Sequence, residues 1–170
     1  MKLSGNILID ERRLRERVEE LARAIAADTP EGTGLSVIAL LDGAFVFAAD
    51  LVRLLPMPVR LALLPVRSVD RGGDPATVEI PEDFPVRGSD VLVVEDILDT
   101  GRTLSRFRER LLSRRPRRLR IAVLLDKPSR RAVPVPVEYV GFTVPDVWLV
   151  GYGLDADGLY RNLPYVTHTV

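Results

Sequence analysis

The chain has 170 residues, of which 24 are basic and 24 acidic, so its formal net charge at pH 7 is zero. This length suits one buried core and a single domain over residues 1–170, and the balanced charge excludes a general attraction to nucleic acid or to an anionic membrane. The sequence contains no cysteine, which excludes disulfides, thiolate metal ligands and cysteine nucleophiles.

The N-terminal segment, MKLSGNILIDERR, has a short apolar run that Asp10 interrupts and that charged residues follow. It therefore lacks the apolar core of a signal peptide. No apolar run in the sequence approaches the ~18 residues that a membrane-spanning helix needs. We expect a cytoplasmic protein without a membrane partner.

The first third of the chain alternates between helix and strand patterns. After Asp10, apolar residues recur at helical spacing as far as Ile25, and the Asp10 side chain can cap this helix. Residues 35–41 (LSVIALL) form a nearly continuous apolar run, which is typical of a buried strand. Residues 44–55 return to helical spacing, and residues 61–66 predict another short strand.

The alternation continues through the rest of the chain. Residues 67–83 are polar, contain glycine and are broken by proline, which indicates a mobile loop or hairpin. Further strands are expected over 90–95, 120–125, 137–142 and 147–150, with a helix over 103–113. Short buried strands that alternate with helices predict an α/β fold, with a mostly parallel central sheet flanked by helices.

The segment VLVVEDILDTGRT (residues 91–103) gathers polar groups where a buried strand ends and a helix begins. Ligands of open α/β sheets bind at such strand ends. The backbone N–H groups of the turn, the hydroxyls of Thr100 and Thr103 and the positive end of the following helix suit a phosphate monoester. The carboxylates of Glu95 and Asp96 suit sugar hydroxyls or a divalent metal ion.

Each acid in this segment also has an ordinary alternative role, because aspartate commonly caps helices and occurs in turns. Three acids together with a Thr-Gly-x-Thr turn favour a binding site instead. Neither the phosphate loop GxxxxGK[ST] nor the dinucleotide loop GxGxxG occurs in the sequence. The segment alone therefore predicts a ribose-phosphate site of another type.

The same segment resembles the phosphoribosyl pyrophosphate (PRPP) signature of the type I phosphoribosyltransferases, in which a hydrophobic strand precedes two acids, two apolar residues and Asp-Thr-Gly-x-Thr. Further segments resemble the hypoxanthine-guanine phosphoribosyltransferases in order and spacing: LLDKPSRR (124–131), VEYVGF (137–142), VGYGLDADGLYRNLPY (150–165) and DGAFVFAADLVR (42–53). The resemblance implies the type I phosphoribosyltransferase fold, with a small hood formed by the terminal segments and a flexible active-site loop.

The resemblance also implies a purine salvage enzyme. Such a transferase moves the 5-phosphoribosyl group from PRPP to hypoxanthine or guanine, gives IMP or GMP with release of pyrophosphate, and uses Mg2+. Glu95 and Asp96 would hold the ribose hydroxyls and organise the metal, while Asp99 would act as general base toward the purine N7. The 5′-phosphate would be wrapped by Thr100, Gly101, Arg102 and Thr103.

The purine subsite follows from the same resemblance. Lys127 would donate to the purine 6-oxo group, and because an ammonium group cannot accept a hydrogen bond it would disfavour adenine. Trp148 would stack on the purine, and Leu149 would present main-chain groups to the purine edge. The ordinary alternatives are an exposed lysine and a core tryptophan.

The pyrophosphate subsite would combine Arg161 with a loop at Asp42 and Gly43, where the family often has a non-proline cis peptide. Asp155 would contact the purine side and bind a second Mg2+, directly or through water. Many relatives carry lysine in place of Asp42, and an acid that faced pyrophosphate would repel it. Either the Asp42 side chain points away from the ligand, or PRPP binds less tightly, and we expect the first.

A second departure from the family pattern lies in the expected active-site loop, which usually carries Ser-Tyr near its start and here carries Ser68-Val69. In the family this loop closes over the reacting ribose and excludes water. The change leaves two outcomes open: the shortened stretch to Pro85 compensates for it, or closure is looser, with slower catalysis and more hydrolysis of PRPP.

The alternative hypothesis is a regulatory protein of the same fold that senses PRPP or a nucleotide without turnover. The arginines at 114, 115, 117, 118 and 120 support it, although such runs are more often solvated helix ends, and nucleic-acid binding is not expected. A pyrimidine transferase is disfavoured by the segment DKPSRR. The resemblance implies a homodimer or homotetramer and leaves open the preference among hypoxanthine, guanine and xanthine.

Overall fold

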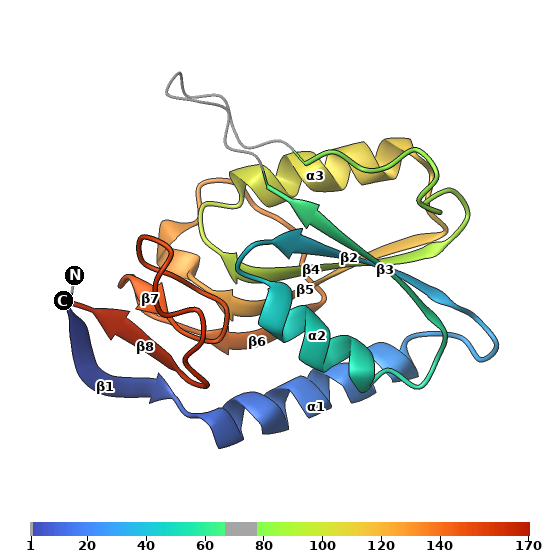
Figure 1. The fold of residues 1–170 in the computed structure, drawn as a ribbon. Coiled ribbons are helices and arrows are strands. Elements are labelled where there is room, and N and C mark those ends of the chain that lie inside the picture. Colours follow the sequence, from blue (N-terminus) through green and yellow to red (C-terminus); the bar gives the residue numbers. More distant parts are fainter. Residues whose placement is uncertain (1, 67–77) are drawn as a thin grey trace.

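A five-stranded parallel sheet with strand order β3-β2-β4-β5-β6 forms the centre of the protein (Figure 1). Its strands are β2 (Leu35–Leu41), β3 (Val59–Pro65), β4 (Asp90–Leu98), β5 (Arg118–Asp126) and β6 (Tyr139–Thr143). Helices α1 (Glu11–Ala27) and α2 (Phe45–Arg53) cover one face of the sheet, and α3 (Arg102–Ser113) covers the other. The predicted α/β fold is confirmed.

The computed structural model describes residues 2–66 and 78–170. The predicted loop over residues 67–83 falls largely outside this range, and the Ser68-Val69 pair lies wholly outside it. In the range described, no helix combines the length and apolarity needed to cross a membrane.

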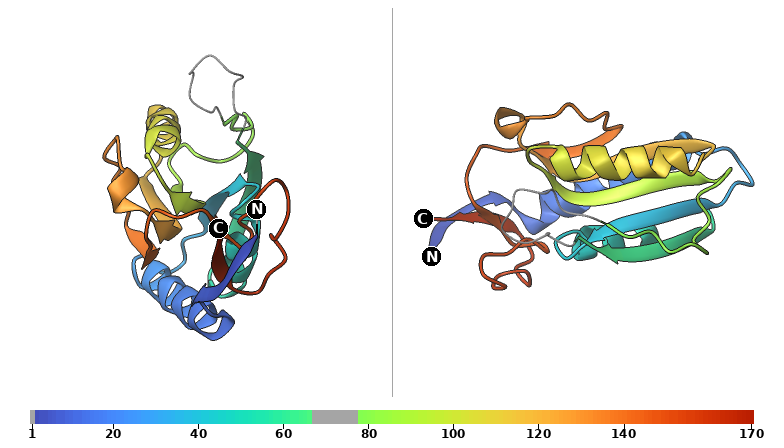
Figure 2. Two further views of the ribbon diagram at one scale, coloured as in Figure 1. Left: turned by 90° about the vertical axis from the view of Figure 1, so that its left-hand side faces the viewer. Right: turned by 90° about the horizontal axis from the view of Figure 1, so that it is seen from above.

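A second sheet joins the two ends of the chain. The strands β1 (Leu3–Ile9), β8 (Val166–Thr169) and β7 (Leu149–Val150) pair antiparallel in the order β1-β8-β7. This sheet stands beyond the carboxyl ends of the central strands, with both chain termini beside it (Figure 2). The predicted hood of terminal segments is confirmed.

The buried strands explain the continuous apolar runs in the sequence. All residues of β2 except Leu41 are buried, because helices cover both faces of the sheet. Strand β4 runs three residues past its predicted end, since Ile97 and Leu98 pair with Leu125 and Asp126 of β5. Helix α1 is capped as expected, with the Arg13 N–H donating to Asp10 over 2.9 Å.

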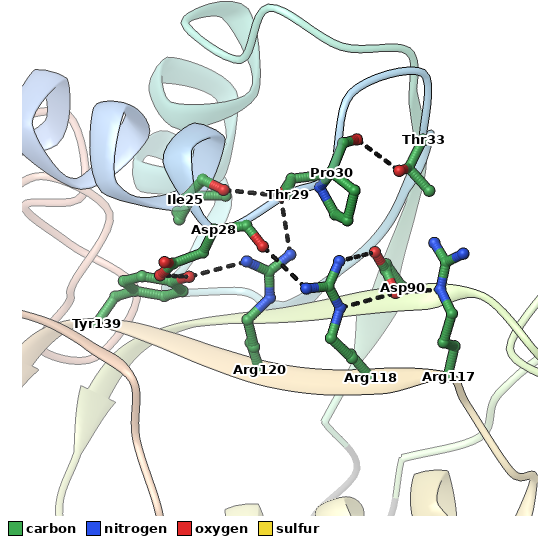
Figure 3. Close-up of polar contacts among 10 residues, drawn as sticks. All are labelled: Ile25, Asp28, Thr29, Pro30, Thr33, Asp90, Arg117, Arg118, Arg120 and Tyr139. Carbon is green, nitrogen blue, oxygen red and sulfur yellow. Dashed lines mark hydrogen bonds and ion pairs between the residues drawn. The ribbon is translucent and has the colours of Figure 1, made fainter.

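The arginine cluster is tied into the fold at the amino end of the sheet (Figure 3). The carboxylate of Asp90, whose side chain is fully buried, pairs with Arg118 at 2.6 Å and with Arg117 at 2.8 Å. Arg120 donates to the Tyr139 hydroxyl and to Thr29 Oγ1, each over 2.9 Å. The guanidinium groups of Arg117, Arg118 and Arg120 are therefore engaged with the chain itself.

These contacts change the ionisation of the groups they join. The hydrogen bond from Arg118, helped by Arg117, holds the pKa of Asp90 well below its usual range, although burial acts in the opposite direction. Burial and the hydrogen bond to Asp28 raise the pKa of Tyr139 to about 12. The cluster thus joins α1, β4, β5 and β6 through groups that hold one protonation state near neutral pH.

Candidate active site

The candidate site lies at the carboxyl edge of the central sheet, where the strands end toward the hood (Figure 1). Because β2, β4 and β5 are parallel and in register, the loops that follow them leave from the same edge. These loops begin at Asp42, Asp99 and Lys127. The segments that the sequence motifs singled out are thereby brought together.

Glu95 and Asp96 are half-buried residues near the end of β4, and their carboxylates are largely shielded from water. Burial, together with the charge of Asp96, raises the pKa of Glu95 well above its ordinary value. Burial raises the pKa of Asp96 to about 6, although backbone N–H groups and Arg161 oppose this shift. Glu95 Oε2 is buried and has no hydrogen-bond partner among residues 2–66 and 78–170. Such an atom is costly to leave unpaired, so this position suits a ligand that supplies a hydroxyl or a cation.

Gly43 packs directly against this carboxylate pair. A Cβ atom at Gly43 would lie 1.6 Å from Asp96 Oδ2, so only glycine fits without movement of Asp96. Gly153, with φ of +102°, would in turn place a Cβ atom 2.2 Å from the Gly43 carbonyl oxygen. A non-proline cis peptide, which the sequence left open, is present between Leu41 and Asp42. Sequence reasoning missed Gly153, for which the Gly-Tyr-Gly spacing was the available signal.

Arg161 lies between two acids beside this loop. It pairs with Asp155 at 2.9 Å, donates to the Gly153 carbonyl over 2.7 Å and approaches Asp42 at 3.7 Å. The second oxygen of Asp155 accepts from the Gly158 N–H over 2.7 Å. The Asp42 side chain is 73% exposed, but its carboxylate faces Arg161, the side chain predicted to meet pyrophosphate. This geometry favours weaker PRPP binding over the expected orientation away from the ligand.

The loop between β4 and α3 has the geometry of an anion site. Gly101 adopts φ of +82° at the start of α3, and a Cβ atom there would lie 2.4 Å from the Val133 carbonyl oxygen. A cavity of about 250 Å³ opens at this loop. It is lined by Glu95, Ile97, Leu98, Asp99, Thr100, Gly101, Thr103 and Leu104. Backbone N–H groups at a helix start favour a phosphate in such a cavity.

The segment that follows β5 supports the loop between β4 and α3 through hydrogen bonds. Thr100 O accepts hydrogen bonds from the N–H groups of Ala132 and Val133, each over 3.0 Å. Arg131 donates to the carbonyl oxygens of Leu98 and Asp99 over 3.0 and 2.9 Å. Residues 131–133 therefore hold the loop between β4 and α3 (residues 99–101), which we call the anion loop, in its conformation. Sequence reasoning did not assign this role to Arg131.

Lys127 and Trp148 frame the opposite side of the site. Lys127 is only 8% exposed, and its ammonium group donates to the Val147 carbonyl over 2.7 Å. Trp148 is 57% exposed, and its indole N–H donates to the Asp155 carbonyl over 3.0 Å. The alternatives of an exposed lysine and a core tryptophan are both wrong. The next residue, Leu149, is buried in β7.

Asp99 is 41% exposed at the end of the strand. Its Oδ1 accepts a hydrogen bond from Arg130 Nε over 3.0 Å, a contact that sequence reasoning did not foresee. Asp99 thus lies between the anion loop and the segment that carries Lys127, where a carboxylate can take a proton from a bound ligand.

Among residues 2–66 and 78–170, no three acidic or histidine side chains are close enough to form a metal site by themselves. This arrangement still suits Mg2+, which commonly binds one or two carboxylates together with substrate phosphates and water. Glu95, with its unpartnered oxygen, and the adjacent Asp96 provide two such carboxylates.

The chain matches the family model described as "Phosphoribosyl transferase domain" over residues 6–157. It is 44% identical to the hypoxanthine phosphoribosyltransferase of Salmonella typhimurium, over 100% of this chain and 98% of the relative. It is 39% identical to the hypoxanthine-guanine phosphoribosyltransferase of Dictyostelium discoideum, over 96% and 94% of the two chains.

Solved structures agree with these matches. A hypoxanthine-guanine phosphoribosyltransferase from Bacillus anthracis superposes with a TM-score of 0.90 and 40% identity, over 99% of both chains. A ternary substrates complex of the Trypanosoma cruzi hypoxanthine phosphoribosyltransferase superposes with a TM-score of 0.92 and 35% identity, over 100% and 97%.

Proposed function

The chain belongs to the phosphoribosyltransferase family, and we propose that it acts in purine salvage, transferring 5-phosphoribosyl from PRPP to hypoxanthine or guanine. The products are IMP or GMP and pyrophosphate. One observation carries the proposal: a single sheet edge holds an anion loop, two half-buried carboxylates with raised pKa, a buried lysine and an exposed tryptophan. We treat residues 1–170 as one such domain.

The anion loop binds the 5′-phosphate through the backbone N–H groups and hydroxyls of residues 100–103. Glu95 and Asp96 accept hydrogen bonds from the ribose hydroxyls, which gives the buried Glu95 Oε2 the partner it lacks. Mg2+ neutralises charge on the pyrophosphate leaving group when it is bound, and Glu95, Asp96 and, through water, Asp155 would hold it.

The purine lies between the anion loop and Trp148. Trp148 stacks on its face, and main-chain groups of Leu149 meet its edge. Lys127 donates to the 6-oxo group, and Asp99 accepts the proton from the purine N7 as the ribosyl bond forms. Adenine is rejected because the Lys127 ammonium group offers no acceptor to its amino group.

The leaving pyrophosphate is bound by Arg161 and by backbone N–H groups at Gly43. Arg161 is already held in place by Asp155 and by the Gly153 carbonyl, which lowers the entropy lost when it meets the ligand. The Asp42 carboxylate partly offsets the positive charge of Arg161 and so weakens the binding of pyrophosphate.

We further propose that the protein is cytoplasmic and assembles as a homodimer or homotetramer. Phe45 and Leu54 of the α2 region are 43% and 44% exposed, and Leu61 and Leu63 of β3 are 41% and 49% exposed. Phe45 and Leu54 line one pocket, and Leu61 and Leu63, two residues apart on β3, point to one face of the sheet. Exposed apolar side chains grouped in this way commonly mark contacts between proteins. The assembly is tested by analytical ultracentrifugation, in which a monomer would contradict it.

The regulatory alternative loses its main support, because the arginines at 114, 117, 118 and 120 bond to the chain's own carbonyl, carboxylate and hydroxyl groups. The test of the enzyme is incubation with PRPP, Mg2+ and one purine at a time. We expect nucleotide from hypoxanthine or guanine and at least about 100-fold less from adenine. Binding of PRPP without formation of any nucleotide would contradict the proposal.

A further inference from the structure

Two side chains outside the proposed subsites form an ion-pair chain between Asp99 and Lys127. Arg130 Nε lies 3.0 Å from Asp99 Oδ1 and 3.8 Å from Asp146 Oδ1. The same Asp146 oxygen lies 4.0 Å from Lys127 Nζ. Charges therefore alternate from the proposed proton acceptor to the proposed donor to the 6-oxo group.

The backbone explains why these groups meet. Arg130 ends a short 3-10 turn (Pro128–Arg130) that begins directly after Lys127, and the Arg130 N–H donates to the Lys127 carbonyl over 3.1 Å. Asp146 directly precedes Val147, whose carbonyl oxygen accepts from the Lys127 ammonium group over 2.7 Å. The three segments that surround the purine in the proposed function are thus joined by Arg130 and Asp146.

The Arg130 contact is suited to orientation rather than to stability. The side chains of Arg130 and Asp99 are 48% and 41% exposed, and ion pairs this exposed stabilise a fold little. The hydrogen bond to Asp99, followed by the charges of Asp99 and Asp146, raises the pKa of Arg130. The guanidinium group engages Oδ1 of Asp99, and within the described residues no hydrogen bond is made to Oδ2, which stays available to a ligand.

The purine N7 and the 6-oxo group lie on one edge of the base, so the groups that meet them must keep a fixed separation. We propose that Arg130, held by Asp146, is a positioning residue that orients Asp99 and keeps it in register with Lys127 along the purine edge. This inference rests on the roles of Asp99 and Lys127 in the proposed function.

The test compares Arg130→Met, Arg130→Lys and Asp146→Asn with Arg106→Met, which changes an exposed arginine of α3 and serves as the matched control. We expect Arg130→Met to lower kcat with hypoxanthine about tenfold, because small misplacement of a reacting group is costly, while KM for PRPP stays within about twofold. Arg130→Lys restores most of kcat, since it keeps the positive charge.

A double variant separates positioning from a general loss of charge. If Asp146 acts through Arg130, Arg130→Met combined with Asp146→Asn is no slower than Arg130→Met alone. Additive losses would overturn the inference, as would unchanged kcat in Arg130→Met or an equal loss in Arg106→Met.

Failure of the proposed function would look different. Trp148 is the chain's one tryptophan, so its fluorescence reports purine nucleotide in the proposed subsite directly. If IMP quenches Trp148 and the wild-type protein turns over, kinetics of the Arg130 variants decide the inference. A wild-type protein without quenching and without turnover would refute the proposed function, and the inference with it.

Discussion

The two ends of strand β4 bury carboxylates in opposite ways. At its start, Asp90 receives two guanidinium groups, and its pKa is lowered (Figure 3). Near its end, Glu95 has a buried oxygen without a partner, and the pKa values of Glu95 and Asp96 are raised. The chain supplies donors where the carboxylate stabilises the fold, and omits them where we propose that a ligand supplies them.

The two ends also respond to pH in opposite directions. Because the folded pKa of Asp90 lies below its unfolded value, its contribution to stability is present above about pH 4 and is lost as the pH falls further. The folded pKa of Asp96 is about 6, above its unfolded value. Stability is therefore lost at this end as the pH rises from about 4 through about 6.

The largest expected effect separates activity from stability at the carboxyl end. Asp99→Asn should lower kcat with hypoxanthine about 100-fold or more, because an amide cannot accept the purine proton. Since Asp99 is only partly buried, Tm should change by less than about 2 °C. Steady-state kinetics and calorimetry measure both, and undiminished turnover would remove Asp99 as the base.

The next prediction concerns Asp90, at the amino end of β4, where a substitution should affect stability rather than activity. Asp90→Asn should lower the free energy of unfolding at neutral pH by about 2 kcal/mol, because the fully buried carboxylate holds two arginines. The folded fraction should keep kcat within about twofold. Urea unfolding at several pH values should show the difference shrink steadily as the pH falls below about 4. A selective loss of activity would refute the assignment of this end to stability.

A smaller effect of opposite sign is expected from Asp96→Asn in the absence of Mg2+ and PRPP. The variant should gain about 1 kcal/mol of stability at pH 8 and none at pH 4, because it removes a carboxylate whose charged form is disfavoured by burial. The exposed acid changed in Glu109→Gln is the control. A loss of stability at pH 8 would mean that this carboxylate supports the fold.

The smallest effect concerns the pyrophosphate side. Asp42→Asn should lower KM for PRPP about threefold, since it removes a negative charge 3.7 Å from Arg161. Inhibition by pyrophosphate should strengthen to a similar degree. A higher KM would show that Asp42 organises this loop rather than opposing its ligand.

Much of the structure around the carboxyl edge of the central sheet could be predicted from the sequence. The apolar run of β2, the Asp10 cap and the segment 91–103 are local patterns, and they appear where expected. The hood of terminal segments was expected only from the family resemblance. No local pattern indicates that β1 pairs with β8, because this pairing joins the two ends of the chain.

The polar contacts around the site could not be predicted from the sequence either. The fit of Gly153 against Gly43 and the hydrogen bond from Arg130 to Asp99 depend on distances between loops. The partners of Asp90 were hidden for the same reason, since a run of arginines does not reveal which carboxylate it meets.

The most direct test of the central claim is thermal melting of the wild type and of the Glu95→Gln, Asp96→Asn double variant near neutral pH, with and without Mg2+ and PRPP. We expect the double variant to melt higher than the wild type when both are unliganded. Saturating ligand should raise the wild-type Tm by about 5 °C and the variant Tm hardly at all. Equal gains in both proteins would contradict the claim that these carboxylates are buried to receive the ligand.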